Sequence, residues 1–166
     1  HSTVMDSTNS TTGWQLPQFR SYQFDTVKDM EDVYLIPSLD CGVKTGDTDP
    51  AHPLYKKPIG ERLANAALYA IYNMKTENNA LAPMPESISY EGNTATVTFK
   101  NTASGLRMAT GTELKGFELI DENGNATEAS AQLNGNQVII TNASISEAKG
   151  VRYAFYRSAP NTIAVS

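Results

Sequence analysis

The stretch from Asp47 to Tyr72, "DTDPAHPLYKKPIGERLANAALYAIY", decides how the first half of the chain folds. From Pro58 to Met74 the apolar residues recur at spacings of three and four, which predicts an amphipathic helix. Pro58 suits its first turn, where a missing N–H leaves no partner unpaired. Glu61 is expected in the same turn, where the helix dipole favours negative charge. The preceding part is a short loop rich in proline and ionisable residues.

This loop contains one pattern with catalytic potential, Asp49 followed three residues later by His52. A carboxylate that accepts a hydrogen bond from one imidazole nitrogen fixes the tautomer and makes the other nitrogen a better base. That nitrogen can take a proton from a serine hydroxyl. The same residues also suit an ordinary turn, in which Asp47 or Asp49 caps the backbone and His52 is exposed. Spacing alone leaves both interpretations open.

Before the loop, "DVYLIPSLD" carries a compact apolar run, Val33 to Ile36, that ends at Pro37. Such a run predicts a strand buried on both faces, as in a parallel sheet. A buried strand, a loop and an amphipathic helix together indicate the end of an α/β layer. A single strand cannot form the sheet that such a helix must cover.

After residue 80 the pattern changes. "APMPESISY" is expected to form a link stiffened by Pro83 and Pro85. Apolar and polar residues then alternate in "TATVTFK", "ELKGFELI", "ASAQL", "QVIIT" and "VRYAFYR", between the turn sequences "EGN", "ASG", "DENGN", "NGN" and "EAKG". Short strands at this spacing predict an antiparallel β-sandwich. The expected fold class is α+β, with residues 1–13 as a disordered linker or non-native remnant, 14–80 as the strand-loop-helix piece and 81–166 as the sandwich.

Composition excludes several classes of function. The 166 residues are 40% hydrophobic and 19% charged, which is typical of a globular domain. The net charge of -5 gives no basic footprint for nucleic acid, and no apolar run approaches the roughly 20 residues of a membrane helix. The single cysteine, Cys41, has no internal disulfide partner and is expected to be a small buried hydrophobe. No second histidine or cysteine lies at metal-ligand spacing from His52, so neither a metal nor a cofactor is expected.

The block "DPAHPLYKKPIGERLA" resembles the last sequence block of the SGNH (GDSL-like) hydrolases, in particular the sialate O-acetylesterase family. That family reads His-Pro-x-Asn-Lys-x-x-Val-Gly-x-Arg-Leu-Ala at this point. Ile59 replaces valine, Tyr55 replaces asparagine, and the remaining motif positions match, namely His52, Pro53, Lys56, Gly60, Arg62, Leu63 and Ala64. "WQLPQF" (Trp14 to Phe19) and "YLIPSLDCG" resemble strands of these esterases. The region after residue 96 resembles the β-sandwich that closes them.

The resemblance implies a Ser-His-Asp type site in which His52 acts as base and then as acid. Asp49 would orient the imidazole, with Asp47 as the other candidate, because many family members place the acid two residues before the histidine, where this chain has Pro50. The family's nucleophile block (Gly-Gln-Ser-Asn or Gly-Asp-Ser) and its oxyanion block are absent. The chain is therefore expected to be the C-terminal portion of a sialate or other carbohydrate O-acetylesterase, inactive alone. Its partners would be an O-acetylated sugar and the missing N-terminal portion, in a secreted, periplasmic or lysosomal setting.

Two other hypotheses remain open from the sequence. In the first, the strands form a non-catalytic carbohydrate-binding or structural module. Tyr153, Phe155 and Tyr156 would then either stack on sugar rings or pack into the core. In the second, a companion chain completes the site without a covalent link and pairs with the free edge of the strand at Val33–Ile36.

Overall fold

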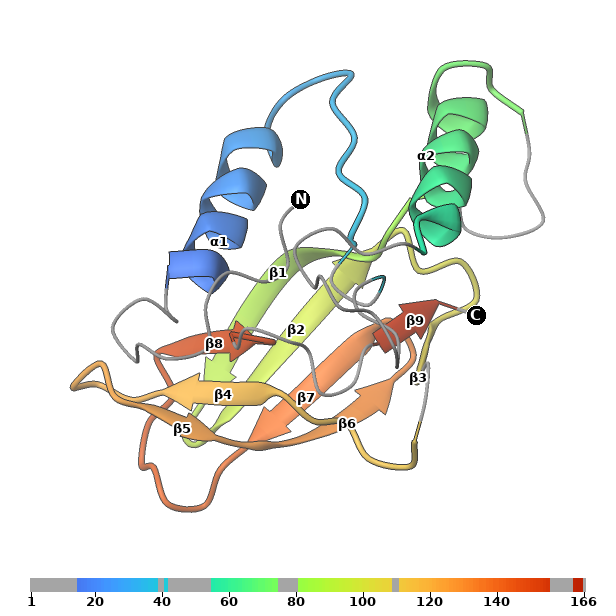
Figure 1. Ribbon diagram of the computed structural model, residues 1–166. Helices are drawn as coiled ribbons and strands as arrows, with labels where there is room; N and C mark the ends of the chain where they lie inside the picture. The colour runs from blue at the N-terminus through green and yellow to red at the C-terminus, as the bar shows by residue number, and fades with distance from the viewer. Residues whose placement is uncertain are drawn as a thin grey trace. The chain divides into compact units, whose positions relative to one another are not determined.

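A computed structural model describes residues 15–38, 41, 55–74, 81–108, 111–155 and 163–165. Within these residues the chain forms two helices and three antiparallel sheets, drawn in Figure 1. It divides into two compact units. Unit 1 is His1–Ala82 with Phe155–Ala159, and unit 2 is Pro83–Ala154 with Pro160–Ser166. The mixture of helices and antiparallel strands confirms the α+β class.

Helix α1 spans Gln15–Val27 in unit 1, so the prediction of a strand at "WQLPQF" was wrong. The stretch from Gln15 to Asp25 contains no valine, isoleucine or threonine, the β-branched residues that favour strands. Pro17 lies in the first turn, where its missing N–H is tolerated. A stripe at helical spacing is shielded from solvent, with Pro17 buried and Arg20, Phe24 and Val27 half-buried.

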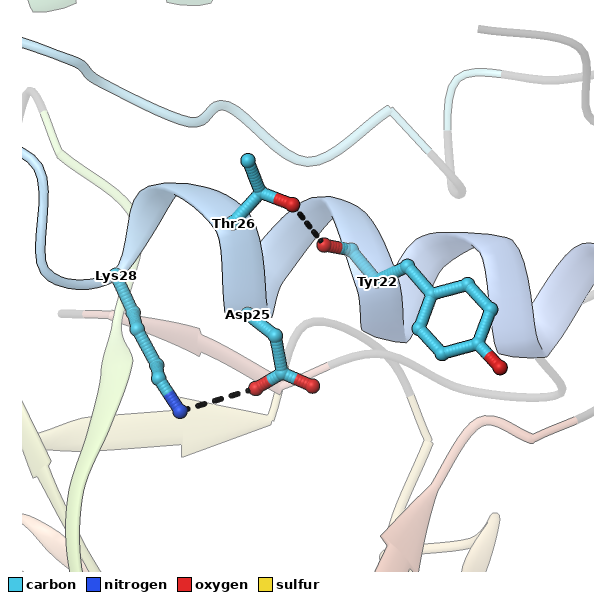
Figure 2. A network of polar contacts seen from close by, with 4 residues as sticks. All are labelled: Tyr22, Asp25, Thr26 and Lys28. Carbon is cyan, nitrogen blue, oxygen red and sulfur yellow. Dashed lines mark hydrogen bonds and ion pairs between the residues drawn. The ribbon is translucent and has the colours of Figure 1, made fainter.

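The end of α1 is held by short-range polar contacts (Figure 2). The Thr26 hydroxyl donates to the Tyr22 carbonyl at 2.7 Å, one turn back along the helix. Lys28 follows the last turn and lies 3.1 Å from the Asp25 carboxylate. A cation at this end also interacts favourably with the helix dipole.

The predicted buried strand at Val33–Ile36 is also wrong. Residues 33–38 have no regular secondary structure, and the side chains of Val33, Tyr34 and Leu35 are exposed. A strand needs a neighbour to take its backbone N–H and C=O groups. Among the described residues, no strand of unit 1 supplies one. An apolar run with strand-like composition therefore forms no strand with the other described residues.

Helix α2 spans Lys57–Ala70, so the predicted helix exists but is shorter than Pro58–Met74. It begins with a proline in its first turn, as expected. Because the helix starts at Lys57, Glu61 lies beyond the first turn, contrary to the prediction, and pairs with Lys57 at 3.5 Å on the exposed surface. Such a pair contributes little, about 0.3–0.5 kcal/mol.

Unit 2 contains the strands. They are β1 Met84–Glu91, β2 Thr94–Lys100, β3 Leu106–Met108, β4 Phe117–Ile120, β5 Ala126–Glu128, β6 Ser130–Asn134, β7 Gln137–Thr141, β8 Gly150–Tyr153 and β9 Ile163–Val165. They pair as a four-stranded sheet in the order β1-β2-β7-β6, a three-stranded sheet β5-β4-β8 and the pair β3-β9. The five predicted strands all appear. The expected link at "APMPESISY" is instead part of β1, so Pro85 lies within an edge strand, where a missing N–H is tolerated.

One hydrophobic cluster joins the four-stranded and three-stranded sheets. Its fully buried members are Ala95 of β2, Val138 and Ile140 of β7, Phe117 and Leu119 of β4, and Ala148 before β8. In β2 and β7 they alternate with outward-facing residues, which is the period-2 pattern that "TATVTFK" and "QVIIT" predict. The inner faces of the two sheets thus share a core.

Glycines close the hairpins where left-handed backbone is required. The two-residue loop between β6 and β7 begins with Gly135 at φ 60°, and its carbonyl accepts a 2.9 Å bond from the Leu106 N–H. Gly105 has φ 132°, and a Cβ there would lie 3.3 Å from the Gly135 carbonyl oxygen. Only glycine fits this backbone without strain. β8 ends at Tyr153, before the end of the predicted strand "VRYAFYR", because Ala154 has φ 50°, outside the extended region.

The two larger sheets differ in the chemistry of their outer faces. Cross-strand partners share a face, so register defines the outer face of the four-stranded sheet. It is rich in hydroxyl and amide side chains and consists of Thr94, Thr96, Thr98 and Lys100 of β2, Gln137, Ile139 and Thr141 of β7, Met84, Ser87, Ser89 and Glu91 of β1, and Ser130, Gln132 and Asn134 of β6. The outer face of the three-stranded sheet instead carries Glu118, Glu128 and Arg152.

Candidate active site

The residues predicted for catalysis lie in one stretch, 42–54, that is outside the described residues. This applies to His52, to Asp49 and to the other candidate acid, Asp47. Their geometry therefore stays a prediction. The structure describes both sides of this stretch, with Ser38 and Cys41 before it and Tyr55 with helix α2 after it.

A hydrogen bond connects these two sides. Arg62 Nη1, on α2, donates to the Pro37 carbonyl oxygen at 2.7 Å, across 25 residues of sequence. Hydrogen bonds from an ionised donor are about twice as strong as neutral ones. The bond links segment 33–38 to α2, the two described segments that precede and follow the predicted loop in the sequence.

Arg62 makes a long-range contact that spacing arguments missed. The sequence showed it only as one of the positions that match the esterase block. Its guanidinium is charged at all physiological pH values and presents several donors in a fixed plane, which suits a carbonyl at a defined place better than a lysine would. The feature of the sequence that could have identified Arg62 is its position in the predicted helix that follows His52.

Cys41 is buried, with 5% of its surface exposed, as the sequence predicted. Its backbone N–H donates to the Ser38 carbonyl at 3.0 Å, which turns the chain at the start of the loop stretch. A buried thiol is a small hydrophobe in packing terms. Cys41 is therefore a buried packing residue.

Many large apolar side chains of unit 1 are exposed. Leu63 of α2 is 54% exposed and Ile71, directly after the end of α2, is 70% exposed, although both lie on the apolar stripe that predicted the helix. Others with substantial exposure are Phe19, Tyr22, Met30, Val33, Tyr34, Leu35, Tyr55, Tyr69, Tyr72 and Met74. The apolar stripe that predicted the helix is therefore only partly buried among the described residues.

Two described ionisable groups have shifted pKa values. Burial lowers the pKa of the Arg20 guanidinium, which still stays protonated because its ordinary value is so high. The pKa of Asp121, in the turn between β4 and β5, is lowered chiefly by the Asn125 side chain, whose Nδ2 donates to Oδ2 at 3.1 Å. Backbone N–H groups of Asn123 and Asn125 add to this at 2.8 and 2.9 Å. Asp121 is a structural carboxylate that holds its turn.

The aromatic platform considered for sugar binding is not formed by the described rings. The Tyr153 ring lies 4.5 Å from that of Phe117 at an interplanar angle of 33°, and Phe117 is almost fully buried. Phe155 is half-buried, and Tyr156 lies outside the described residues. Tyr153 therefore covers the core next to Phe117, which agrees with the packing interpretation.

The described part of the chain was searched for a metal-ligand group and for a membrane-spanning helix, with these results. It contains no group of three or more histidine, cysteine, aspartate or glutamate side chains placed to hold a metal ion. Within the same residues, neither helix is long and apolar enough to cross a membrane.

Comparison with known proteins finds a structural relative. A carbohydrate acetylesterase from Xanthomonas citri superimposes with a TM-score of 0.63 and 26% sequence identity over 72% of this chain. The chain is structurally similar to a carbohydrate esterase. It spans 27% of the length of that enzyme. No protein-family model matches the chain, and no curated protein matches it in sequence.

Proposed function

We propose that this chain is the C-terminal portion of a carbohydrate O-acetylesterase. In the whole enzyme it supplies His52 and Asp49 to a Ser-His-Asp site, and the serine and oxyanion donors come from an upstream α/β portion. The single observation that carries the proposal is the structural match to a carbohydrate acetylesterase over 72% of the chain. The ordered series of sequence matches around "DPAHPLYKKPIGERLA" agrees with it.

The reaction proposed is acyl transfer to serine and then to water. The serine Oγ attacks the acetyl carbonyl carbon while His52 takes the hydroxyl proton. The tetrahedral intermediate collapses, and His52 gives that proton to the departing sugar oxygen. Water then attacks the acetyl-serine with the same assistance and releases acetate. The Asp49 carboxylate orients the imidazole and stabilises its protonated form throughout.

Two features of unit 1 support a role within a larger α/β domain. Apolar side chains of α2 and of segment 33–38 are exposed, and the described residues of unit 1 contain no strand on which they could pack. Arg62 of α2 links these two segments through the Pro37 carbonyl. In open α/β folds, catalytic residues lie in loops at the carboxyl ends of strands. An upstream sheet would give Val33–Ile36 the neighbour it lacks.

Acetate release tests the proposal. The chain alone and the longer parent polypeptide are each incubated with an O-acetylated oligosaccharide, with and without His52→Ala. We expect release only from the parent, and a loss of at least 10³-fold in kcat on His52→Ala. Activity of the isolated chain would show that the nucleophile lies within it. An active parent unaffected by His52→Ala would remove this chain from the catalytic site.

A further inference from the structure

The sequence contains two Asn-Gly pairs, Asn123-Gly124 and Asn134-Gly135, and each lies at a hairpin turn of unit 2. The backbone nitrogen that follows an asparagine can attack the carbon of its side-chain amide. Glycine favours this attack because it has no Cβ and rotates freely. The new C–N bond closes a succinimide ring and expels ammonia, and water then opens the ring to aspartate or isoaspartate. Both pairs are therefore candidates for deamidation.

The pair Asn134-Gly135 is held by contacts with other strands. Asn134 is the last residue of β6. The Gly135 carbonyl accepts a bond from the Leu106 N–H of β3 at 2.9 Å, and the Asn136 carbonyl accepts one from the Phe99 N–H of β2 at 2.9 Å. Ring closure at Asn134 requires the backbone to rotate at this turn, so it has to break contacts with both strands.

The turn that contains Asn123-Gly124 is held only by its own residues. The Gly124 N–H, on the nitrogen that would attack, donates to the Asp121 carbonyl at 3.1 Å. The Asp121 carboxylate accepts the Asn123 N–H at 2.8 Å and, from Asn125, the N–H at 2.9 Å and Nδ2 at 3.1 Å. Among the described residues, the hydrogen bonds of 121–125 all stay within this turn.

The surroundings of this second pair are also open. Asn123 and Gly124 are both exposed to solvent, and no atom lies within 4 Å of a Cβ added at Gly124. Solvent-exposed turns with few outside contacts open locally far more often than the strands of a core. Opening releases the Gly124 nitrogen from the Asp121 carbonyl, and it leaves room for the ring to close.

We propose that Asn123 is the principal site of spontaneous deamidation among the described residues, and that the hydrogen bonds of Asp121 set its rate. The aspartate product places a third carboxylate beside those of Asp121 and Glu122, and like charges at this distance repel one another. The isoaspartate product also lengthens the backbone within the hairpin. Both products weaken the turn, so the modification loosens the connection between β4 and β5.

Peptide mapping by mass spectrometry tests this inference on the intact 166-residue chain, incubated in mildly alkaline buffer. Asn134 is the reference within each digest, because global unfolding would speed both sites together. Asp121→Ala removes the carboxylate that accepts the three bonds of the turn. Glu122→Ala is the matched control, since it removes a neighbouring exposed carboxylate that accepts none of them. Asn123→Gln keeps an amide but requires a less favourable, larger ring.

We expect aspartate and isoaspartate to accumulate faster at Asn123 than at Asn134. Asp121→Ala should speed the reaction at Asn123 alone by about three- to tenfold, the value of one hydrogen bond. Glu122→Ala should leave the rate within about twofold, less than one hydrogen bond, and Asn123→Gln should abolish the fast reaction. Faster reaction at Asn134, equal acceleration by the two carboxylate variants, or equal acceleration of both sites by Asp121→Ala would each overturn the inference.

The proposed loosening of the hairpin has its own readout. Asn123→Asp reproduces the charge of the aspartate product without the chemistry of ring closure. We expect this variant to melt at a lower temperature than the unmodified chain at neutral pH, and to regain most of the difference in high salt, which screens repulsion between exposed carboxylates. A melting temperature equal to that of the unmodified chain would contradict the loosening.

Discussion

At the scale of single residues, two aspartates compete for one role beside His52. Asp49 has the Asp-x-x-His spacing, and Asp47 lies two residues earlier. In the parent esterase we expect Asp49→Asn to lower kcat by about 10⁴-fold, because the imidazole loses the partner that fixes its tautomer. Asp47→Asn should leave kcat within the same order of magnitude. Steady-state acetate release measures both, and the opposite ranking would assign the acid to Asp47.

Asp121 gives a pH-dependent prediction. Its pKa is lowered by the Asn125 side chain and by backbone N–H groups, so the ionised form stabilises the turn. This contribution is complete above the ordinary carboxyl pKa, near 3.9, and is lost as the pH falls through the lower folded value. Asp121→Ala should lower the melting temperature at neutral pH and make no difference in strong acid. An equal loss at both pH values would mean that the charge is not what holds the turn.

At the scale of elements, one exchange made at two places tests the core of unit 2. Ile140 of β7 is fully buried, whereas Ile88 of β1 is 44% exposed. We expect Ile140→Ala to lower the free energy of unfolding by about 2–5 kcal/mol through lost burial and a residual cavity. Ile88→Ala should cost less than about 1 kcal/mol. Urea unfolding measures both, and similar costs would contradict the described core.

The effect of a substitution at Gly60 on the stability of α2 depends on what packs against this turn of the helix. No atom lies within 4 Å of a Cβ added there, and glycine weakens a helix interior. In this chain Gly60→Ala should therefore stabilise α2 by about 0.5–1 kcal/mol, read as slower amide hydrogen exchange along the helix. In the parent protein the gain should vanish or reverse if the upstream portion packs against this turn. Faster exchange in the isolated chain would contradict the open surroundings of Gly60.

The elements predicted correctly from the sequence are strands of unit 2 and helix α2. The contacts that stabilise them lie within unit 2 or within the helix itself. In β2 and β7, alternating Ala95, Val97, Val138 and Ile140 have partners within the chain, so pattern and structure agree. Val33–Ile36 has the same kind of composition but pairs with no strand of the described residues, and the pattern alone carries no information about a neighbouring strand. At "WQLPQF" the family resemblance outweighed the absence of β-branched residues, and the chain forms α1 instead.

At the scale of the whole molecule, the candidate site stays a prediction from the motif, which points to His52 and Asp49 but lies outside the described residues. Only contacts on either side of that stretch are described. Arg62 and Pro37 are 25 residues apart, and their 2.7 Å contact depends on how α2 lies against segment 33–38. The outer face of the four-stranded sheet likewise could not be predicted as a surface, because it arises from the register of four strands.

The most direct test of the central claim asks whether His52 activates a serine, independently of which sugar is the substrate. A fluorophosphonate probe forms a bond from an activated serine Oγ to phosphorus and releases fluoride. In the parent polypeptide we predict covalent labelling that slows by at least roughly 10²-fold on His52→Ala, the lower range for loss of a general base. Mass spectrometry should place the label upstream of this chain. Equal labelling rates with and without His52, or no labelling of the parent at all, would contradict the account.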